Sequence, residues 1–332
     1  MQKVRWVLFL LLFPLQAGMA ATPQNPLLVG HNLYVSHKGI HKFNQSTLEL
    51  TWSSLNGIQT FAPVMGKSLL YVGSPQGLYA LNPENGDVAW HIEETRSVFS
   101  PVVADQLYAG SLHGALYSIN PASGAIKWRQ QFDGWIYSPA VLPGDKLLWT
   151  GGQAHKAFAI AIEDGRQLHS LSINQESIFS PQNIGRHQVA FNLFDGSTVI
   201  INTKTASIDG YLDGSTQPKN LKYDQEIIYR SSRDGGLTAF DRSSLHQKWR
   251  KTLVTLDLTI HPANEDYLLM SDLDKTLILF SRQKGNEIWR ERLTGNWFSP
   301  IQTDDNSIVY FQSSALQRNE ISAVKVDATP TY

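Results

Sequence analysis

A repeated unit of about 40 residues constrains the fold of this chain more than any other feature of the sequence. Two segments overlay closely: residues 68–90 read SLLYVGSPQGLYALNPENGDVAW, and residues 106–128 read QLYAGSLHGALYSINPASGAIKW. The position that closes the unit recurs at intervals of 38, 38, 41, 41, 39 and 40 residues. It is occupied by Trp52, Trp90, Trp128, His169, Gly210, Trp249 and Trp289. Such units bury their apolar surfaces against one another rather than alone.

Within each unit, short apolar stretches of period 2 alternate with turns rich in glycine, proline, asparagine and aspartate. This spacing excludes helical repeats and predicts four short strands, A to D, in every unit. A four-stranded unit of this length is typical of a β-propeller blade. The Asn-Pro-x-x-Gly segments at 82–86 and 120–124 are predicted to turn from strand C to strand D.

Seven complete units extend from about Leu27 to Trp289, and three more strands are predicted at 299–303, 307–313 and 321–327. The sequence therefore predicts an all-β chain that forms one eight-bladed β-propeller of four-stranded antiparallel blades. The last blade then has three strands. A seven-bladed ring is the alternative, but it would leave those three strands without a place.

Two sequence markers accompany each unit. The first is an aromatic-Ser-Pro segment or a close variant. Its proline precedes or opens strand A, because proline has no backbone N–H to donate to the hydrogen bonds of a sheet. It occurs at 61–63, 99–101, 137–139, 179–181 and 298–300. The second is the tryptophan that is expected to end strand D, whose ring would fill the wedge between adjacent blades. This structural role is predicted for Trp52, Trp90, Trp128, Trp249 and Trp289.

The first 20 residues have the pattern of a cleaved export signal. Lys3 and Arg5 precede an apolar run at 6–13, and small residues lead up to Ala20. The apolar run is much shorter than the roughly 20 residues of a membrane-spanning helix. We therefore expect a signal peptide at residues 1–20 and one propeller domain at residues 21–332, soluble in the bacterial periplasm.

Charge and cysteine content restrict the partners. The formal net charge is −1, and without Lys3 and Arg5 it becomes 26 − 29 = −3. A chain this close to neutral has no electrostatic footprint for nucleic acid. The absence of cysteine excludes disulfides, a thiol nucleophile and the lipid attachment of bacterial lipoproteins. We expect a monomer with no lipid anchor and no membrane span.

The segments LYALNPENGDVAW and LYSINPASGAIKW resemble the pyrroloquinoline-quinone (PQQ)-type propeller repeat, which has a Leu-Asp-x-x-(Thr/Ser)-Gly-x-x-x-Trp pattern. The resemblance extends over nearly all of the expected mature chain. In size, export signal and organisation the chain is similar to BamB-like scaffold proteins of outer-membrane assembly, although those are lipoproteins. This resemblance implies non-catalytic binding of periplasmic or outer-membrane proteins, without a cofactor.

A small-ligand or PQQ-binding protein is the alternative within the same repeat family. The quinoprotein dehydrogenases hold PQQ over a calcium ion, are much longer, and usually have a vicinal cysteine pair. In this chain, acids at 272–275 and 303–307 could offer some calcium ligands or could bond their own turns. His37 and His41 would lie about 13 Å apart on one strand and could not share a metal.

Candidate partner-binding residues share one face of the predicted propeller. In an antiparallel blade, the D–A links between units and the B–C turns within units lie at the same end. Aromatic anchors beside arginine are typical of protein-binding hot spots. The alternative is that these aromatic rings fill gaps between blades. The candidates are Phe99, Trp135, Tyr137, Phe179, Trp297, Phe298, His113, His155, Arg233 and Asp234.

The sequence has no nucleophile elbow, phosphate loop, dinucleotide fingerprint or zinc motif. It therefore favours a non-catalytic scaffold that binds proteins in envelope or outer-membrane protein biogenesis. A PQQ-binding protein is the second hypothesis. A hydrolase or lyase, which would need a polar cluster at the mouth of the central channel, is the third.

Overall fold

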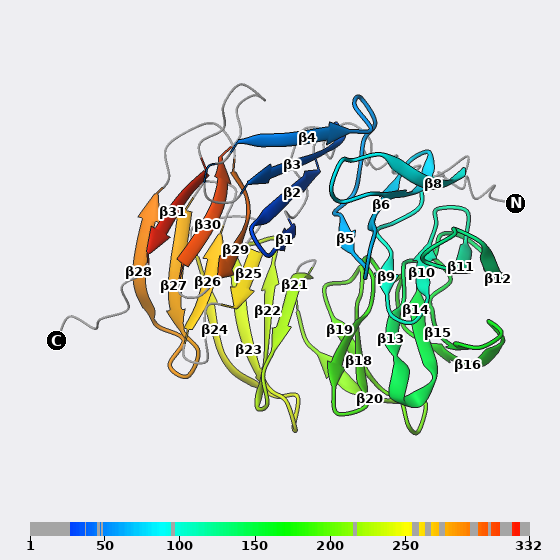
Figure 1. The fold of residues 1–332 in the computed structure, drawn as a ribbon. Helices are drawn as coiled ribbons and strands as arrows, with labels where there is room; N and C mark the ends of the chain where they lie inside the picture. Colours follow the sequence, from blue (N-terminus) through cyan, green and yellow to red (C-terminus); the bar gives the residue numbers. More distant parts are fainter. Residues whose placement is uncertain are drawn as a thin grey trace, which may run out of the picture.

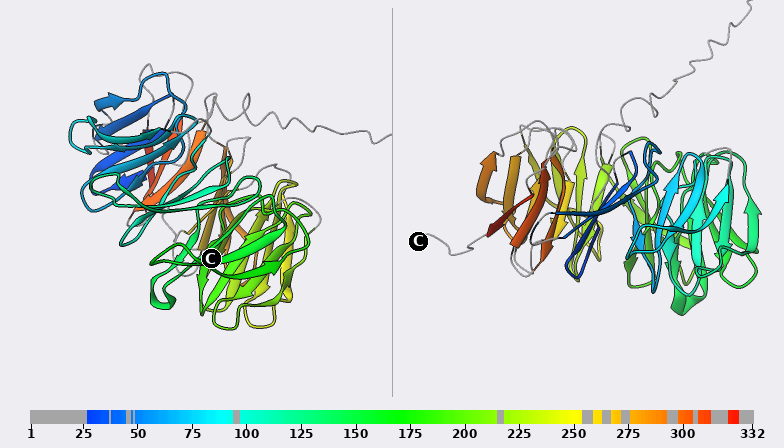
Figure 2. Two further views of the ribbon diagram at one scale, coloured as in Figure 1. Left: turned by 90° about the vertical axis from the view of Figure 1, so that its right-hand side faces the viewer. Right: turned by 45° about the horizontal axis from the view of Figure 1, so that its top comes forward.

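The computed structural model describes residues 27–325, apart from short stretches at 37, 45–46, 48, 94–96, 215–217, 254–258, 263–266, 272–275, 293–297, 305–306 and 313–320. In this part of the chain, antiparallel strands form seven four-stranded sheets and one three-stranded sheet, each from consecutive strands. The sheets follow one another around a ring, and β29–β31 lies between β25–β28 and β1–β4 (Figures 1 and 2). The predicted all-β propeller with a three-stranded last blade is confirmed.

Each blade consists of strands that follow one another directly in the chain. Blades 1 to 4 are β1 (Leu27–Val29), β2 (Asn32–Ser36), β3 (Ile40–Asn44), β4 (Leu50–Ser54); β5 (Val64–Met65), β6 (Leu70–Ser74), β7 (Gly77–Leu81), β8 (Val88–Glu93); β9 (Val102–Val103), β10 (Leu107–Gly110), β11 (Ala115–Ile119), β12 (Ile126–Gln131); β13 (Ala140–Leu142), β14 (Leu147–Gly151), β15 (Lys156–Ala161), β16 (Gln167–Ser172). Blades 5 to 8 are β17 (Gln182–Gly185), β18 (Gln188–Asn192), β19 (Thr198–Asn202), β20 (Ser207–Leu212); β21 (Pro218–Tyr223), β22 (Ile227–Ser232), β23 (Gly236–Asp241), β24 (Gln247–Thr252); β25 (Thr259–Pro262), β26 (Tyr267–Ser271), β27 (Thr276–Ser281), β28 (Glu287–Arg292); β29 (Phe298–Asp304), β30 (Ser307–Gln312), β31 (Ile321–Lys325). A short 3₁₀ turn, η1 (Pro143–Asp145), joins β13 to β14.

The middle strands of each blade carry the core. Every residue of β6 and β7 is buried, whereas the outer strand β8 of the same blade is mostly exposed. Strands B and C are covered on both faces because a neighbouring blade lies on each side. Strands B and C are therefore largely apolar throughout, in place of the period-2 alternation that the sequence predicted.

A tryptophan on the outer strand of one blade contacts the C–D turn of the next blade. Trp90 Nε1 in β8 donates a hydrogen bond to Pro121 O in the turn that follows β11, at 3.1 Å. In the same turn, Gly124 has φ +73, and a Cβ atom there would lie 2.8 Å from the Trp90 ring. The other tryptophans with this contact to a turn glycine are Trp52 with Gly86, Trp128 with Gly165, and Trp249 with Gly285. The turn glycine is needed both for its left-handed backbone and for the room it leaves the indole.

The tryptophans do not end strand D as predicted. Trp90 and Trp128 are each the third residue of a six-residue strand, and three more residues pair with strand C after them. Strand D continues beyond the tryptophan because its last residues form hydrogen-bonded pairs with the first residues of strand C. The indole therefore lies near the middle of the outer strand.

Where the closing tryptophan is missing, the neighbouring turn carries a larger residue. Gly210 in β20 faces the next blade, and a Cβ atom on it would lie 2.8 Å from Leu245 Cδ1. Leu245 has φ 59, a left-handed conformation that glycine adopts in the turns that contact a tryptophan. In blade 4, His169 takes the closing position, and Trp149 lies fully buried in the same cross-strand row. Bulk has been exchanged across the junction between Gly210 and Leu245.

Two buried arginines of blade 6 also bind blade 5. Arg242 donates to Asp224 O at 2.7 Å and to Ile184 O. Arg230 donates to Leu212 O at 2.8 Å. A buried cation is tolerated when protein groups accept its hydrogen bonds, and here main-chain carbonyl oxygens accept bonds from both guanidinium groups, although Arg242 Nε has no partner among the described residues. These contacts hold together the junction at which Gly210 stands in place of a tryptophan.

The turn glycines provide a test of the tryptophan contact. We expect Gly86→Ala to lower the unfolding free energy by about 1 kcal/mol for the left-handed backbone and by a further ~1–3 kcal/mol for the clash with Trp52. The control is Gly57→Ala, because Gly57 has φ +84 but nothing within 4 Å of its Cβ position. Urea unfolding measures both. Equal losses would show that the indole is not confined by the turn.

A double-mutant cycle tests the exchange of bulk at the other junction. Gly210→Trp alone should clash with Leu245, and Leu245→Gly alone should leave a gap over Gly210. Together they recreate the tryptophan–glycine contact of the other blades. We expect a favourable coupling of about 1–3 kcal/mol between the two changes, measured by urea unfolding of the four proteins. Strictly additive effects would contradict this pairing.

Candidate partner-binding face

The D–A links and the B–C turns lie together, as predicted, and we call their common surface the link face. In the part of the chain that the structure describes, direct main-chain hydrogen bonds join links to turns. Leu112 N donates to Ser97 O at 3.0 Å, and Phe194 N donates to Glu176 O at 3.0 Å. The links also continue the pairing of strand A, because Phe99 N donates to Gly110 O at 2.9 Å in strand B of the same blade. The link face is therefore a rigid extension of the sheets.

Glycines near the ends of the B strands let neighbouring links approach closely. A Cβ atom on Gly110 would lie 2.4 Å from Ile136 O, which belongs to the link of the next blade. At Gly73 the corresponding oxygen is Val98 O, at 2.5 Å. Contacts this short leave no room for a side chain, so the glycines determine how tightly the links pack.

Three aromatic residues that open neighbouring blades form a row on the link face. The ring centroids of Phe61 and Phe99 are 6.1 Å apart, and those of Phe99 and Tyr137 are 4.8 Å apart. All three side chains are partly buried. Burial, and secondarily the Glu176 carboxylate, hold the pKa of the Tyr137 phenol well above its ordinary value of 10. Phe99 and Tyr137 thus fill space between blades, the alternative considered for the predicted partner residues.

Blade 5 presents more exposed aromatic surface. Phe179 is 37% exposed in the link before β17, and Phe194 is 38% exposed in the turn after β18. An isolated bridge between Ser177 and Leu193 joins the two segments. Sequence reasoning identified Phe179 but missed Phe194. Its signal was a phenylalanine directly before the Asp195-Gly196 turn, where a polar residue would be usual.

Charged side chains gather where blade 5 meets blade 6. Burial, and secondarily the charge of Arg250, lower the pKa of the Arg230 guanidinium to about 10, while Asp213, Asp195 and Asp234 act in the opposite direction. The Arg230 guanidinium also lies 5.0 Å from the centre of the Phe240 ring. Asp234 Oδ2 accepts a hydrogen bond from Arg250 at 3.0 Å. Of the predicted pair Arg233 and Asp234, only Arg233 is exposed.

The remaining predicted residues are dispersed along the link face. Trp135 is partly buried, and its Nε1 has no hydrogen-bond partner among the described residues. His113 O accepts a hydrogen bond from Gln131 Nε2 at 2.6 Å. His155 is exposed, and its Nε2 lies 3.6 Å from Glu176 Oε1. Trp297 and the side chain of Phe298 lie outside the described residues.

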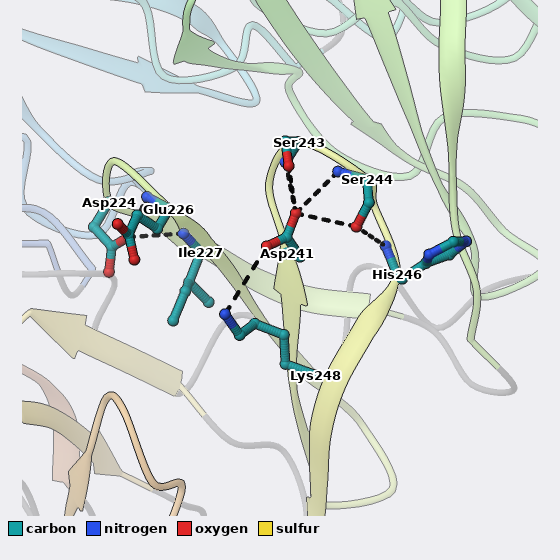
Figure 3. A network of polar contacts seen from close by, with 8 residues as sticks. All are labelled: Asp224, Glu226, Ile227, Asp241, Ser243, Ser244, His246 and Lys248. Atoms are coloured by element: carbon teal, nitrogen blue, oxygen red, sulfur yellow. Dashed lines mark hydrogen bonds and ion pairs between the residues drawn. The ribbon is translucent and has the colours of Figure 1, made fainter.

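Aspartates in the described turns bond their own backbone and neighbours. Figure 3 shows Asp241, whose carboxylate accepts hydrogen bonds from Ser243 and Ser244. These bonds hold its pKa far below the ordinary value. Asp224 likewise accepts from the backbone N–H of Ile227 at 2.8 Å. The acids predicted at 272–275 lie outside the described residues, as do 305–306 of the second segment.

Two further observations concern sites and membranes. Among the described residues, no group of three or more His, Cys, Asp or Glu side chains could hold a metal ion. His41 is buried and its Nδ1 lies 2.8 Å from Ser53 Oγ, while His37 is outside the described residues. In the part of the chain that the structure describes, no helix has the length and apolar character to cross a membrane.

The buried phenol of Tyr137 predicts a pH effect on stability. An unfolded chain ionises this tyrosine near pH 10, whereas the folded chain keeps it neutral to a higher pH. Folding stability that depends on the neutral phenol is therefore present below pH 10 and lost above it. We expect Tyr137→Phe to lose less stability than the parent between pH 8 and pH 11, by about 1 kcal/mol in urea unfolding. Equal losses of stability in the variant and the parent over this pH range would contradict a buried Tyr137 phenol.

Known proteins similar to the chain share the propeller fold. Residues 93–216 match the PQQ-repeat family model described as outer membrane protein assembly factor BamB. No curated protein sequence matches the chain. The crystal structure of BamB from Moraxella catarrhalis superposes with a TM-score of 0.73 at 17% identity, covering 87% of this chain and 91% of that one.

Two other solved structures are comparable. The computationally designed Ika8 protein has a TM-score of 0.74 at 13% identity, with 88% of this chain and 93% of that one covered. The dihydro-heme d1 dehydrogenase NirN, in complex with DHE, has a TM-score of 0.69 at 13% identity, with 81% and 66% covered. These likenesses, together with the repeat pattern and the matched family model, confirm the predicted resemblance. The chain has a β-propeller fold like that of BamB, and its residues 93–216 match the PQQ-type repeat family.

Proposed function

We propose that this chain is a non-catalytic scaffold of the bacterial envelope that binds other proteins through its link face and acts in outer-membrane protein assembly. The observation that carries the proposal is the exposed aromatic surface of blade 5. Phe179 and Phe194 stand on short segments that main-chain hydrogen bonds tie to the blade. Rigidly held aromatic side chains are efficient anchors for a protein partner, because little side-chain entropy is lost on binding.

The likeness to BamB supports the biological setting of this proposal. Both the matched family model and one of the solved structures carry the BamB name. The export-signal pattern at residues 1–20, which lies outside the described residues, supports a periplasmic location for the rest of the chain. We propose that the scaffold works without PQQ, calcium or another cofactor.

Site-specific cross-linking in intact bacteria tests the role of the link face. A photo-reactive phenylalanine analogue at position 179 or 194 should cross-link to envelope proteins. The same analogue at Leu50, which is 52% exposed on the outer strand of blade 1, is the control. We further expect the double variant Phe179→Ser/Phe194→Ser to reduce recovery of the cross-linked partners in pull-downs by about tenfold, because it removes two anchors.

Two outcomes would contradict the proposal. Equal cross-linking from Leu50 and from the two phenylalanine positions would mean that the link face is not selective. Partners recovered from the cytoplasmic fraction alone would contradict the location in the envelope. Circular dichroism of the double variant establishes that its propeller is still folded.

A further inference from the structure

The exposed phenylalanines of blade 5 lie between carboxylates on both flanks. The segment before Phe179 pairs with the segment before Phe194 in antiparallel fashion, with Ser177 opposite Leu193. Glu176 lies next to Phe194 through the hydrogen bond from Phe194 N to Glu176 O. On the other flank, a Cβ atom on Gly214 would lie 2.4 Å from Gly196 O, which brings Asp213 beside the turn that holds Asp195. These residues therefore form one continuous surface at the link-face end of blade 5.

The charged side chains that this surface exposes to a partner are acidic. Asp195 and Asp213 are exposed, and the Glu176 side chain is 30% exposed. Among the described side chains, no lysine or arginine forms an ion pair with these three acids. The nearby Arg230 is buried, and it donates hydrogen bonds to the main-chain oxygens of Leu212 and Asp213. The neighbour of Glu176 is His155, and histidine is a far weaker counter-ion than lysine or arginine at neutral pH.

We propose that the surface formed by Glu176, Phe179, Phe194, Asp195 and Asp213 binds an extended segment of a partner protein in which arginine or lysine alternates with apolar side chains. This inference rests on the proposed scaffold function and names the chemistry of the partner. Alternation suits the site because each of the two paired segments has one acid and one phenylalanine, Glu176 with Phe179 and Asp195 with Phe194. Basic side chains would meet the carboxylates and stack on the phenyl faces, and apolar ones would cover the exposed rings.

The rest of the described link face is less suited to such a segment. Phe61, Phe99 and Tyr137 already contact one another and are partly buried. The exposed aliphatic side chains of the outer strands, such as Leu50, Val88 and Ile126, stand singly on separate blades. Scattered single apolar residues are ordinary on soluble proteins. Blade 5 combines exposed aromatic rings with acids that form no ion pair with a described lysine or arginine, and this combination favours a basic-apolar partner.

Fluorescence anisotropy with two labelled synthetic peptides tests the proposal on the purified chain. In one peptide arginine alternates with leucine, and in the other glutamate replaces every arginine. We expect the arginine peptide to bind at least about tenfold more tightly at low salt, and added salt to weaken it. The variant Phe194→Ser should weaken binding about tenfold through loss of an anchor.

The acids are tested by Asp195→Asn/Asp213→Asn. Asparagine can still accept the turn bond from Ser197 N, and the Asp213 carbonyl that Arg230 uses is unchanged, so the fold should be retained. We expect about tenfold weaker binding of the arginine peptide and a smaller salt effect. The matched control, Asp87→Asn/Asp105→Asn, neutralises two exposed acids on the opposite face and should leave the affinity unchanged. Thermal unfolding verifies that every variant is folded.

Two results would overturn the proposal: equal binding of the glutamate peptide, or no effect of the Asp195→Asn/Asp213→Asn change on affinity. Either result is separable from failure of the scaffold function. If the Phe179→Ser/Phe194→Ser variant still loses its envelope partners, the scaffold function stands and only the basic-apolar chemistry is wrong. If that variant keeps its partners and neither peptide binds, both proposals are wrong.

Discussion

The contact between the outer strand of one blade and the C–D turn of the next is the interaction on which the propeller depends. No blade can bury both faces of strands B and C alone, and apolar surface is removed from water only when neighbouring blades close upon each other. The indole of Trp90 reaches across this boundary with an apolar ring and a hydrogen-bond donor at once. Gly124 accepts the ring because it has no side chain. One large residue and one absent side chain thus determine the spacing of two blades.

The exceptions show that complementarity matters more than the identity of either residue. At Gly210 the side-chain volume comes from Leu245 in the neighbouring blade, and Leu245 adopts a left-handed backbone conformation there. The same junction has the buried Arg230 and Arg242, each of which donates a hydrogen bond to a main-chain carbonyl oxygen of blade 5. In close-packed interiors, volume lost on one side must be supplied on the other. A propeller can therefore lose its repeat signature locally and keep its geometry.

The same tight packing shapes the link face. Because glycines such as Gly110 let adjacent links approach, the aromatic residues that open blades 2 to 4 turn their rings toward one another. At blade 5, by contrast, Phe179 and Phe194 retain substantial exposure. The close packing of adjacent links, which is common to several blades, thus leaves blade 5 with exposed aromatic surface. Functional residues commonly stand on such loops of a rigid framework.

The sequence by itself determined the fold class, the unit length, most strand positions and the face shared by links and turns, because period-2 alternation and turn chemistry are local signals. Trp90 and Trp128 were recognisable as structural from their spacing alone. Their place in the middle of strand D depended on how far that strand pairs with strand C of the same blade. The pairing of Gly210 with Leu245 depended on a contact between segments about 35 residues apart, which no local pattern encodes. Likewise, only the tertiary structure separated the packed Phe99 and Tyr137 from the exposed Phe179 and Phe194, since exposure is a property of neighbours in space and not of residue type.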